Sequence, residues 1–133
     1  ALPEIRSGTV ADAASIKLPK RIPYHIAMDM LFTGRWLDAT EAHRWGFVNE
    51  ILPADKLMTR AWELARLLEN GPPLVYAAIK EVVREAEGAK FQDTMNKVTR
   101  RQLKTVDVLY GSDDNLEGAK AFAEKRDPVW KGK

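Results

Sequence analysis

The sequence has no cysteine, and this absence excludes several kinds of chemistry. Disulfides, thiolate metal sites and a cysteine nucleophile are all ruled out. The lack of cysteine also fits a reducing compartment, and a cytoplasmic location is the expectation. The chain contains no apolar run near the roughly 20 residues that a membrane-spanning helix requires. No membrane partner is therefore expected.

A strong net charge is missing as well. The 133 residues carry a net charge of only +2, and the charged residues, 30% of the chain, have both signs interspersed. A nucleic-acid-binding surface normally shows as a basic stripe, and here only Lys17, Lys20 and Arg21 form a minor cluster. No nucleic-acid partner is expected. The content of 45% hydrophobic residues is that of a globular protein with a core.

Histidine is scarce. His25 and His43 stand apart from any metal-ligand or catalytic-triad spacing, so neither a metal site nor a hydrolase triad is predicted. The four tryptophans are expected to be packing residues.

The first nineteen residues, ALPEIRSGTVADAASIKLP, combine small residues with two acids. Glu4 follows a proline directly, Gly8 comes four residues later, and Asp12 stands in a run of small residues. Proline fixes φ and glycine relaxes the steric limits on it, so this pattern suits a sharply turning chain that a ligand can approach closely. The alternative is a solvated surface loop, because most acidic residues are exposed. The residues alone leave both interpretations open.

Most of the remaining chain has helical periodicity. Asp38 is predicted to cap a short helix, with Glu41 completing a pair that resembles a capping box, and Ser112 is predicted to cap the last helix. The segment Phe47–Leu52 alternates loosely before Pro53 and is predicted to be a short strand. The predicted helices cover residues 23–32, 38–46, 54–70, 72–88, 90–110 and 112–128.

The helices after Pro72 could bury little without a partner surface, because little strand accompanies them. The second half is therefore expected to pack on a larger body that is absent from this sequence. The chain begins at Ala1 and enters at once on the small-residue motif. A piece of a longer protein is the expectation.

Several motifs follow one another in a fixed order. They are LPE with a glycine four residues later, KLPK, MLFTGRWLDATEAHRWGFVNEILP, a PPL helix and SDDNLEGAKAFAEKRDPVWKGK. In this order they resemble the C-terminal half of the crotonase (enoyl-CoA hydratase/isomerase) superfamily, over essentially all 133 residues. The tail FAEKRDPVWKGK looks most like that of the carnitinyl-CoA dehydratases, that is, crotonobetainyl-CoA hydratases.

The resemblance implies an α/β fold in which repeated ββα turns form a spiral. A helical C-terminal region follows and builds trimers, often paired into hexamers. On this view, residues 1–70 are the end of the spiral core domain with the active-site loop. Residues 71–133 are the helical trimerisation region, so this chain is the mostly α-helical half of the fold.

The resemblance also implies chemistry on acyl-CoA thioesters, in fatty acid or carnitine metabolism. Coenzyme A is part of the substrate, and no cofactor is bound permanently. Glu4 matches the glutamate of the family's PE motif, a general acid/base that moves protons next to the thioester carbonyl. The two backbone N–H groups that hold the thioester oxygen, and a second carboxylate, lie upstream. The N-terminal half of the same protein is therefore an expected partner, and this chain alone is expected to be inactive.

Asp12 falls where dienoyl-CoA isomerases of the superfamily carry a second catalytic acid. A double-bond isomerase that uses Glu4 and Asp12 is thus an alternative to a hydratase, and a plain loop role for Asp12 is equally open. Gly8, Ala11 and Ala13 are the expected substrate-pocket positions. Many hydratases of the family have a proline and a glycine pair where Ala11, Ala13 and Ala14 stand, so the acyl pocket is expected to differ here.

Lys125, in the EKR motif, matches a family position that reaches the adenosine phosphates of CoA. Lysine commonly serves phosphate as a point charge, and a solvated helix lysine is the alternative. A few crotonase-fold proteins are non-catalytic or associate with RNA, which gives a third possible function. The net charge of +2 makes it the weakest of the three.

Overall fold

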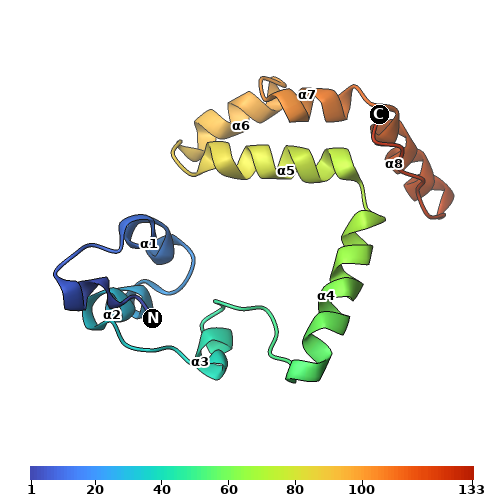
Figure 1. Cartoon of the computed structure of the whole chain (residues 1–133). Helices are drawn as coiled ribbons and strands as arrows, with labels where there is room; N and C mark the ends of the chain where they lie inside the picture. Colours follow the sequence, from blue (N-terminus) through green and yellow to red (C-terminus); the bar gives the residue numbers. More distant parts are fainter. The chain divides into compact units, whose positions relative to one another are not determined.

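The computed structural model describes all 133 residues, and every regular element in it is helical (Figure 1). The elements in chain order are η1 (Pro3–Ser7), α1 (Asp12–Lys17), η2 (Leu18–Lys20), α2 (Tyr24–Thr33), α3 (Ala39–Arg44), α4 (Ala54–Glu69), α5 (Pro73–Ala86), α6 (Phe91–Thr99), α7 (Lys104–Tyr110) and α8 (Asp113–Glu124), where η1 and η2 are 3-10 helices.

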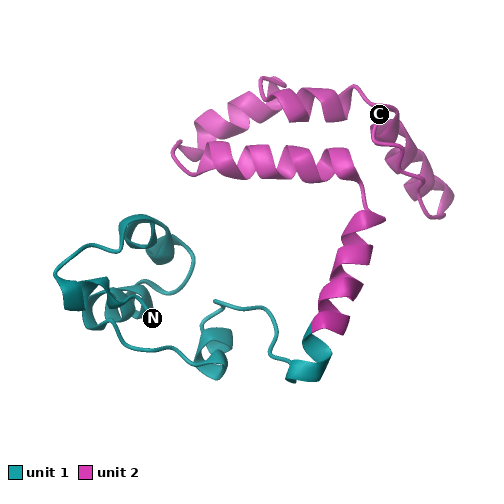
Figure 2. Cartoon of the chain, in the orientation of Figure 1, with its two compact units in different colours: residues 1–57 teal, residues 58–133 magenta.

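The chain divides into two compact units, residues 1–57 and 58–133 (Figure 2). The first unit holds η1 to α3, and the second holds most of α4 together with α5 to α8. The predicted boundary near residue 70 concerns the domains of the whole protein and stays a prediction.

Local chemistry sets several helix ends where the sequence predicts them. Gly34 ends α2 in the left-handed conformation, with φ +59°. The Asp38 carboxylate accepts the Glu41 N–H at 2.7 Å, and the Ser112 hydroxyl accepts the Asn115 N–H at 3.1 Å. The predicted capping box is only half formed, because the Glu41 carboxylate binds the Arg35 guanidinium at 2.8 and 2.6 Å. These bonds hold the pKa of Glu41 below its ordinary value.

The predicted strand Phe47–Leu52 does not form. The N–H groups of Phe47 and Val48 bond instead to the carbonyl of Ala42, at 2.8 and 3.4 Å, and thereby close the end of α3. A strand needs a neighbouring strand to satisfy its backbone groups, and this chain has no strand to offer. Phe47 and Ile51 remain 50% and 48% exposed.

The predicted helix 90–110 is broken into α6 and α7. Arg101 takes the left-handed conformation with φ +53°, and the Gln102 N–H bonds back to the Lys97 carbonyl at 2.8 Å. After the break, Leu103 and Val106 are buried against Ala78 of α5. Gln102, which interrupts the apolar stripe, marks the turn in the sequence.

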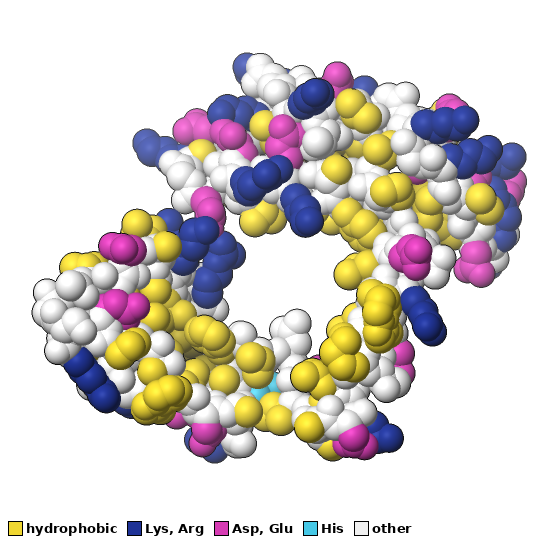
Figure 3. Space-filling view, viewed as in Figure 1, with side chains coloured by type: hydrophobic (Ala, Val, Ile, Leu, Met, Phe, Trp, Pro, Cys, Tyr) yellow, Lys and Arg dark blue, Asp and Glu magenta, His cyan; other side chains and the backbone are white.

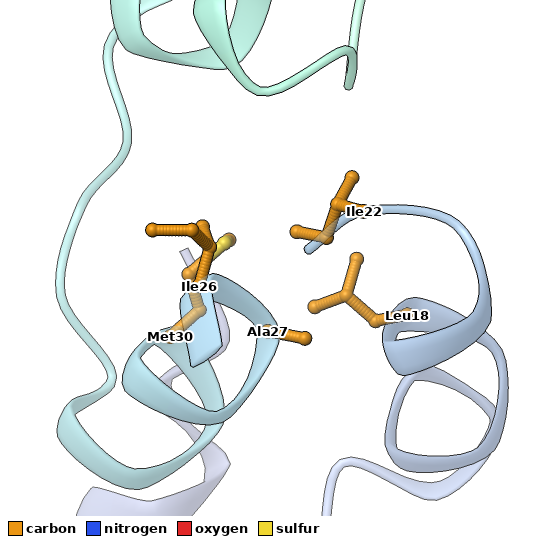
Figure 4. Packing of buried hydrophobic residues seen from close by; sticks show 5 residues of the cluster. All are labelled: Leu18, Ile22, Ile26, Ala27 and Met30. Atoms are coloured by element: carbon orange, nitrogen blue, oxygen red, sulfur yellow. The ribbon is translucent and has the colours of Figure 1, made fainter. Parts of the chain in front are cut away.

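The core of the first unit joins α2 to the segment before it. Leu18 and Ile22 point toward α2, where Ala27 is fully buried and Met30 nearly so (Figure 4). Each buried aliphatic side chain of this kind contributes about 1.5–3 kcal/mol through apolar surface removed from water. This small core holds α2 in place. The end of α2 in turn contacts η1 through Gly34, as described below.

The second unit has its own core, in which α5 lies alongside α6 and α7 (Figure 1). Ala78 of α5 packs with Leu103 and Val106. The Glu81 carboxylate of α5 accepts the backbone N–H of Thr105 at 2.7 Å and also its hydroxyl, so it caps the start of α7. These hydrogen bonds hold the pKa of Glu81 below its ordinary value.

Two helices keep apolar faces exposed. No residue of α4 is buried, and its leucines at 57, 64 and 68 are 56%, 40% and 57% exposed. Figure 3 shows hydrophobic side chains gathered on the surface of this helix. In α8, Phe122 is 88% exposed. Exposed apolar stripes of this size mark interaction surfaces. They support the expectation that a larger body, absent from this chain, packs on these helices.

Candidate active site

Glu4 lies in the first turn of η1, which Pro3 opens. Its side chain is partly buried, and its Oε2 atom has almost no exposed surface and no hydrogen-bond partner. Buried polar atoms are nearly always hydrogen-bonded in folded proteins, so this carboxylate oxygen is a candidate for contact with a group from outside the chain. Oε2 keeps its acceptor capacity for a water molecule or a substrate.

Gly34, the glycine of the TG motif, holds η1 against the end of α2. A Cβ atom placed on Gly34 would lie 3.0 Å from Cγ2 of Ile5, 3.2 Å from the Leu2 carbonyl oxygen and 3.3 Å from Nε of Arg6. These three neighbours flank Glu4 in the sequence. The close approach therefore fixes the segment that carries the candidate acid/base.

The loop after Glu4 turns at Gly8 and ends in a helix that the sequence did not predict. Gly8 has φ +70°, and its N–H bonds to the Ile5 carbonyl at 3.2 Å. Asp12 then opens α1 with φ +33°, an unusual value for a residue other than glycine, and its exposed carboxylate makes no hydrogen bond. Ala11 precedes it as the partly buried N-cap residue. The alanines that follow favour a helix over the predicted loop.

A cleft of about 790 Å³ opens in the first unit, between α1, η2, α2 and α3. Of the predicted site residues, Ala13 lines this cleft, whereas Glu4, Gly8, Ala11 and Asp12 do not. The volume is that of a typical small-molecule site. The charged lining residues have both signs, and the larger apolar ones are Leu2, Leu18, Ile22, Met30, Leu37, Phe47 and Val48.

Lys125 belongs to the second unit and caps the C-terminus of α8. It is exposed, and its backbone is left-handed, with φ 55° and ψ 41°. Its N–H bonds to the Phe122 carbonyl at 3.3 Å, while its ammonium group forms no ion pair within the chain. A free ammonium group is suited to an external anion.

The tail after Lys125 folds back on α8 and is held there by two acids. The Glu117 carboxylate accepts hydrogen bonds from both terminal nitrogens of Arg126, at 2.6 and 2.9 Å, and from the Val129 N–H, at 2.9 Å. The buried Asp114 carboxylate accepts the N–H groups of Lys131 and Gly132, at 2.7 and 2.8 Å. We call Asp114, Glu117 and Arg126 the tail clamp.

Gly118 makes room for this tail. A Cβ atom on Gly118 would meet the Trp130 ring at 3.2 Å, so the ring packs directly on the helix backbone. The packing role predicted for all four tryptophans is confirmed for Trp130 and wrong for Trp36 and Trp62, which are 78% and 59% exposed. Sequence reasoning missed the tail clamp. The available signal was a glycine inside a helix, which usually has a packing reason.

The ion pair between Glu117 and Arg126 predicts that the local stability of the tail depends on pH. The guanidinium of Arg126, and then the Val129 N–H, lower the pKa of Glu117 from 4.5 to about 2. Because the folded-state pKa is lowered, the stabilisation is present above pH 4.5 and is lost as the pH falls toward 2. Hydrogen exchange, corrected for intrinsic rates, should show protection of the Val129 amide falling over this range. Glu117→Gln should remove that dependence, and protection in the wild type that is constant over this range would contradict the assignment.

The structure gathers no group of three or more His, Asp or Glu side chains that could hold a metal ion. His25 packs edge-on against Trp45, with ring centroids 5.8 Å apart. No helix of the chain is both long enough and apolar enough to span a bilayer.

Comparison with known proteins gives one family. The enoyl-CoA hydratase/isomerase model matches residues 1–133. Carnitinyl-CoA dehydratase from Citrobacter koseri is 44% identical over the whole chain, which covers 51% of that protein. The same enzyme from Salmonella paratyphi A is 43% identical, with 51% covered.

Solved structures agree with this match. Enoyl-CoA hydratase EchA1 from Mycobacterium marinum is 37% identical, with a TM-score of 0.80 over 98% of this chain and 51% of its own. Enoyl-CoA hydratase from Mycobacterium tuberculosis is 36% identical, with a TM-score of 0.80 and the same shares covered. This chain thus spans about half the length of the relatives it matches. It belongs to the enoyl-CoA hydratase/isomerase (crotonase) family and corresponds to the C-terminal half of its members.

Proposed function

We propose that this chain is the C-terminal half of an acyl-CoA thioester hydratase/dehydratase that acts on a carnitinyl-CoA or crotonobetainyl-CoA type of substrate. The observation that carries the proposal is the 44% identity, over the whole chain, with carnitinyl-CoA dehydratase from Citrobacter koseri. Because the chain covers 51% of that relative, the activity is that of the whole protein.

Glu4 is the general acid/base of this proposal. In hydration, the oxygen of a water molecule bonds to the β-carbon of the enoyl thioester, and a proton is delivered to the α-carbon. A carboxylate can position that water and carry protons when one of its oxygens has no competing partner, as Oε2 of Glu4 has none. The second carboxylate and the N–H groups that hold the thioester oxygen come from the N-terminal half, the partner without which this chain is inactive.

The cleft of the first unit is proposed to take part of the acyl group. Its lining is largely apolar and includes Ala13, one of the expected substrate-pocket positions. Lys17 and Arg21 are opposed by Asp38 on the lining, so charge alone does not select a cationic acyl group. The choice of a carnitine-type substrate rests on the relatives.

The second unit is proposed to serve assembly and CoA binding. The exposed apolar stripes of α4 and α8 support packing against the N-terminal half and other subunits, in a homotrimer or hexamer. Lys125, with no partner in the chain, is proposed to contact the adenosine phosphates of CoA. Coenzyme A enters as part of the substrate, without a permanently bound cofactor, and the cytoplasm is the proposed location.

A substrate comparison with the full-length protein tests the proposal. We expect hydration of both crotonobetainyl-CoA and crotonyl-CoA, with the higher kcat/KM for crotonobetainyl-CoA. A higher kcat/KM for crotonyl-CoA would overturn the assignment of a carnitine-type substrate and leave the hydratase assignment intact. Absence of hydration with both substrates would overturn the proposed function.

A dienoyl-CoA isomerase is the second candidate, and Asp12 favours it. Its φ of +33° is a strained conformation, and strained residues cluster at functional sites. An isomerase would use Glu4 and Asp12 as its two proton carriers. In that case Asp12→Asn would abolish dienoyl-CoA isomerisation by the full-length protein, whereas the hydratase proposal expects hydration to survive this substitution.

A further inference from the structure

The residues around Lys125 show an arrangement that the proposed function does not use. We infer that Arg126 is a positioning residue for Lys125, because it binds the neighbouring carboxylates and so keeps the Lys125 ammonium group available for the phosphates of CoA. The inference rests on the proposed function for the identity of the ligand.

Arg126 binds two acids of α8, Glu117 and Glu124. Its terminal nitrogens bind Glu117 at 2.6 and 2.9 Å, and its Nε binds Glu124 at 2.7 Å. Glu124 directly precedes Lys125 in the chain. With both carboxylates taken by Arg126, Lys125 forms no ion pair.

The backbone around Lys125 is fixed by the same residue. The Arg126 N–H bonds to the Ala121 carbonyl at 3.1 Å, which closes the end of α8. This turn holds Lys125 in the left-handed conformation, where glycine or asparagine is the usual residue. A lysine here carries backbone strain that glycine would avoid.

Loss of the Arg126 side chain would weaken phosphate binding through electrostatic interactions. Glu117 and Glu124 would then lack their cation, and the Lys125 ammonium group would be the adjacent replacement. An internal ion pair would compete with phosphate for the ammonium group, and the uncompensated carboxylates would repel the anion. Arg126 thus keeps Lys125 available to an anion by binding the carboxylates of Glu117 and Glu124.

The test measures binding of CoA, and of pantetheine, which lacks the phosphates, to the full-length protein by calorimetry. We expect Arg126→Gln to weaken CoA binding about fivefold, the size expected of an exposed charge pair. Binding of pantetheine should be unchanged, and the KM for the acyl-CoA should rise without a change in kcat. Lys80→Gln, which removes an exposed charge from α5, should leave CoA binding unchanged.

A triple variant separates this effect from damage to the fold. Glu117→Gln and Glu124→Gln, added to Arg126→Gln, remove the competing carboxylates and should restore CoA binding. Failure of this rescue, or an equal loss of pantetheine binding, would overturn the inference while leaving the proposed function intact. Unchanged CoA binding in Lys125→Ala would overturn both the inference and the proposed phosphate contact. A wild-type protein that binds no CoA would contradict the proposed function itself.

Discussion

The full-length protein carrying Glu4→Gln should hydrate its enoyl-CoA substrate on the order of 10²–10⁴-fold more slowly in kcat, the contribution typical of a positioned acid/base. Glutamine keeps the shape of the side chain and cannot exchange the proton. The KM should change little, because the substitution affects a proton transfer rather than the binding of CoA. Steady-state kinetics of the purified full-length protein measures both constants.

Glu69→Gln is the matched control for this prediction. Glu69 is an exposed acid at the end of α4 that makes no hydrogen bond or ion pair within the chain, so its replacement should leave kcat unchanged. Hydration that persists at the wild-type rate in Glu4→Gln would remove Glu4 from the mechanism. The unpaired Oε2 atom would then need another explanation.

Gly34→Ala should have the second large effect, on both stability and activity. Its φ of +59° costs an alanine about 1–2 kcal/mol, and the new Cβ would press on the Leu2 carbonyl oxygen at 3.2 Å. We expect the free energy of unfolding to fall by about 2 kcal/mol or more. Because the displaced segment carries Glu4, kcat should also fall, and a shift of about 1 Å at a reacting group can cost about 100-fold.

Gly46→Ala is the matched control for stability. Gly46 has φ +72°, and no atom lies within 4 Å of the position that a Cβ would take, so it shares the backbone strain of Gly34 without its close contacts. Denaturant unfolding should therefore show a smaller loss for Gly46→Ala than for Gly34→Ala. Equal losses would mean that the contact of Gly34 with η1 contributes nothing.

Helix ends were predictable because they depend on neighbours in the sequence. Asp38 and Ser112 act on backbone groups within a few residues, and each begins a helix as predicted. The strand Phe47–Leu52 was wrong because a strand depends on a partner strand. The break at Arg101 was also missed, since it is set by packing of α7 on α5.

The candidate site could be predicted from the sequence only in part. Glu4 was identified from a motif that resembles one of a known family. Only the structure shows that one of its carboxylate oxygens has no hydrogen-bond partner. The tail clamp joins Asp114 and Glu117 to residues 9–18 positions away in the chain, a spacing that no local rule predicts. The second carboxylate that the proposal requires is expected in the N-terminal half of the whole protein.

Hydration in water enriched in ¹⁸O tests the central proposal most directly. The full-length protein is incubated with crotonobetainyl-CoA, and the product is analysed by mass spectrometry. The proposal predicts a hydroxyacyl-CoA that contains one heavy oxygen from water, formed by the wild type and almost absent with Glu4→Gln. Recovery of unchanged substrate, or of an isomer of the same mass, would contradict it.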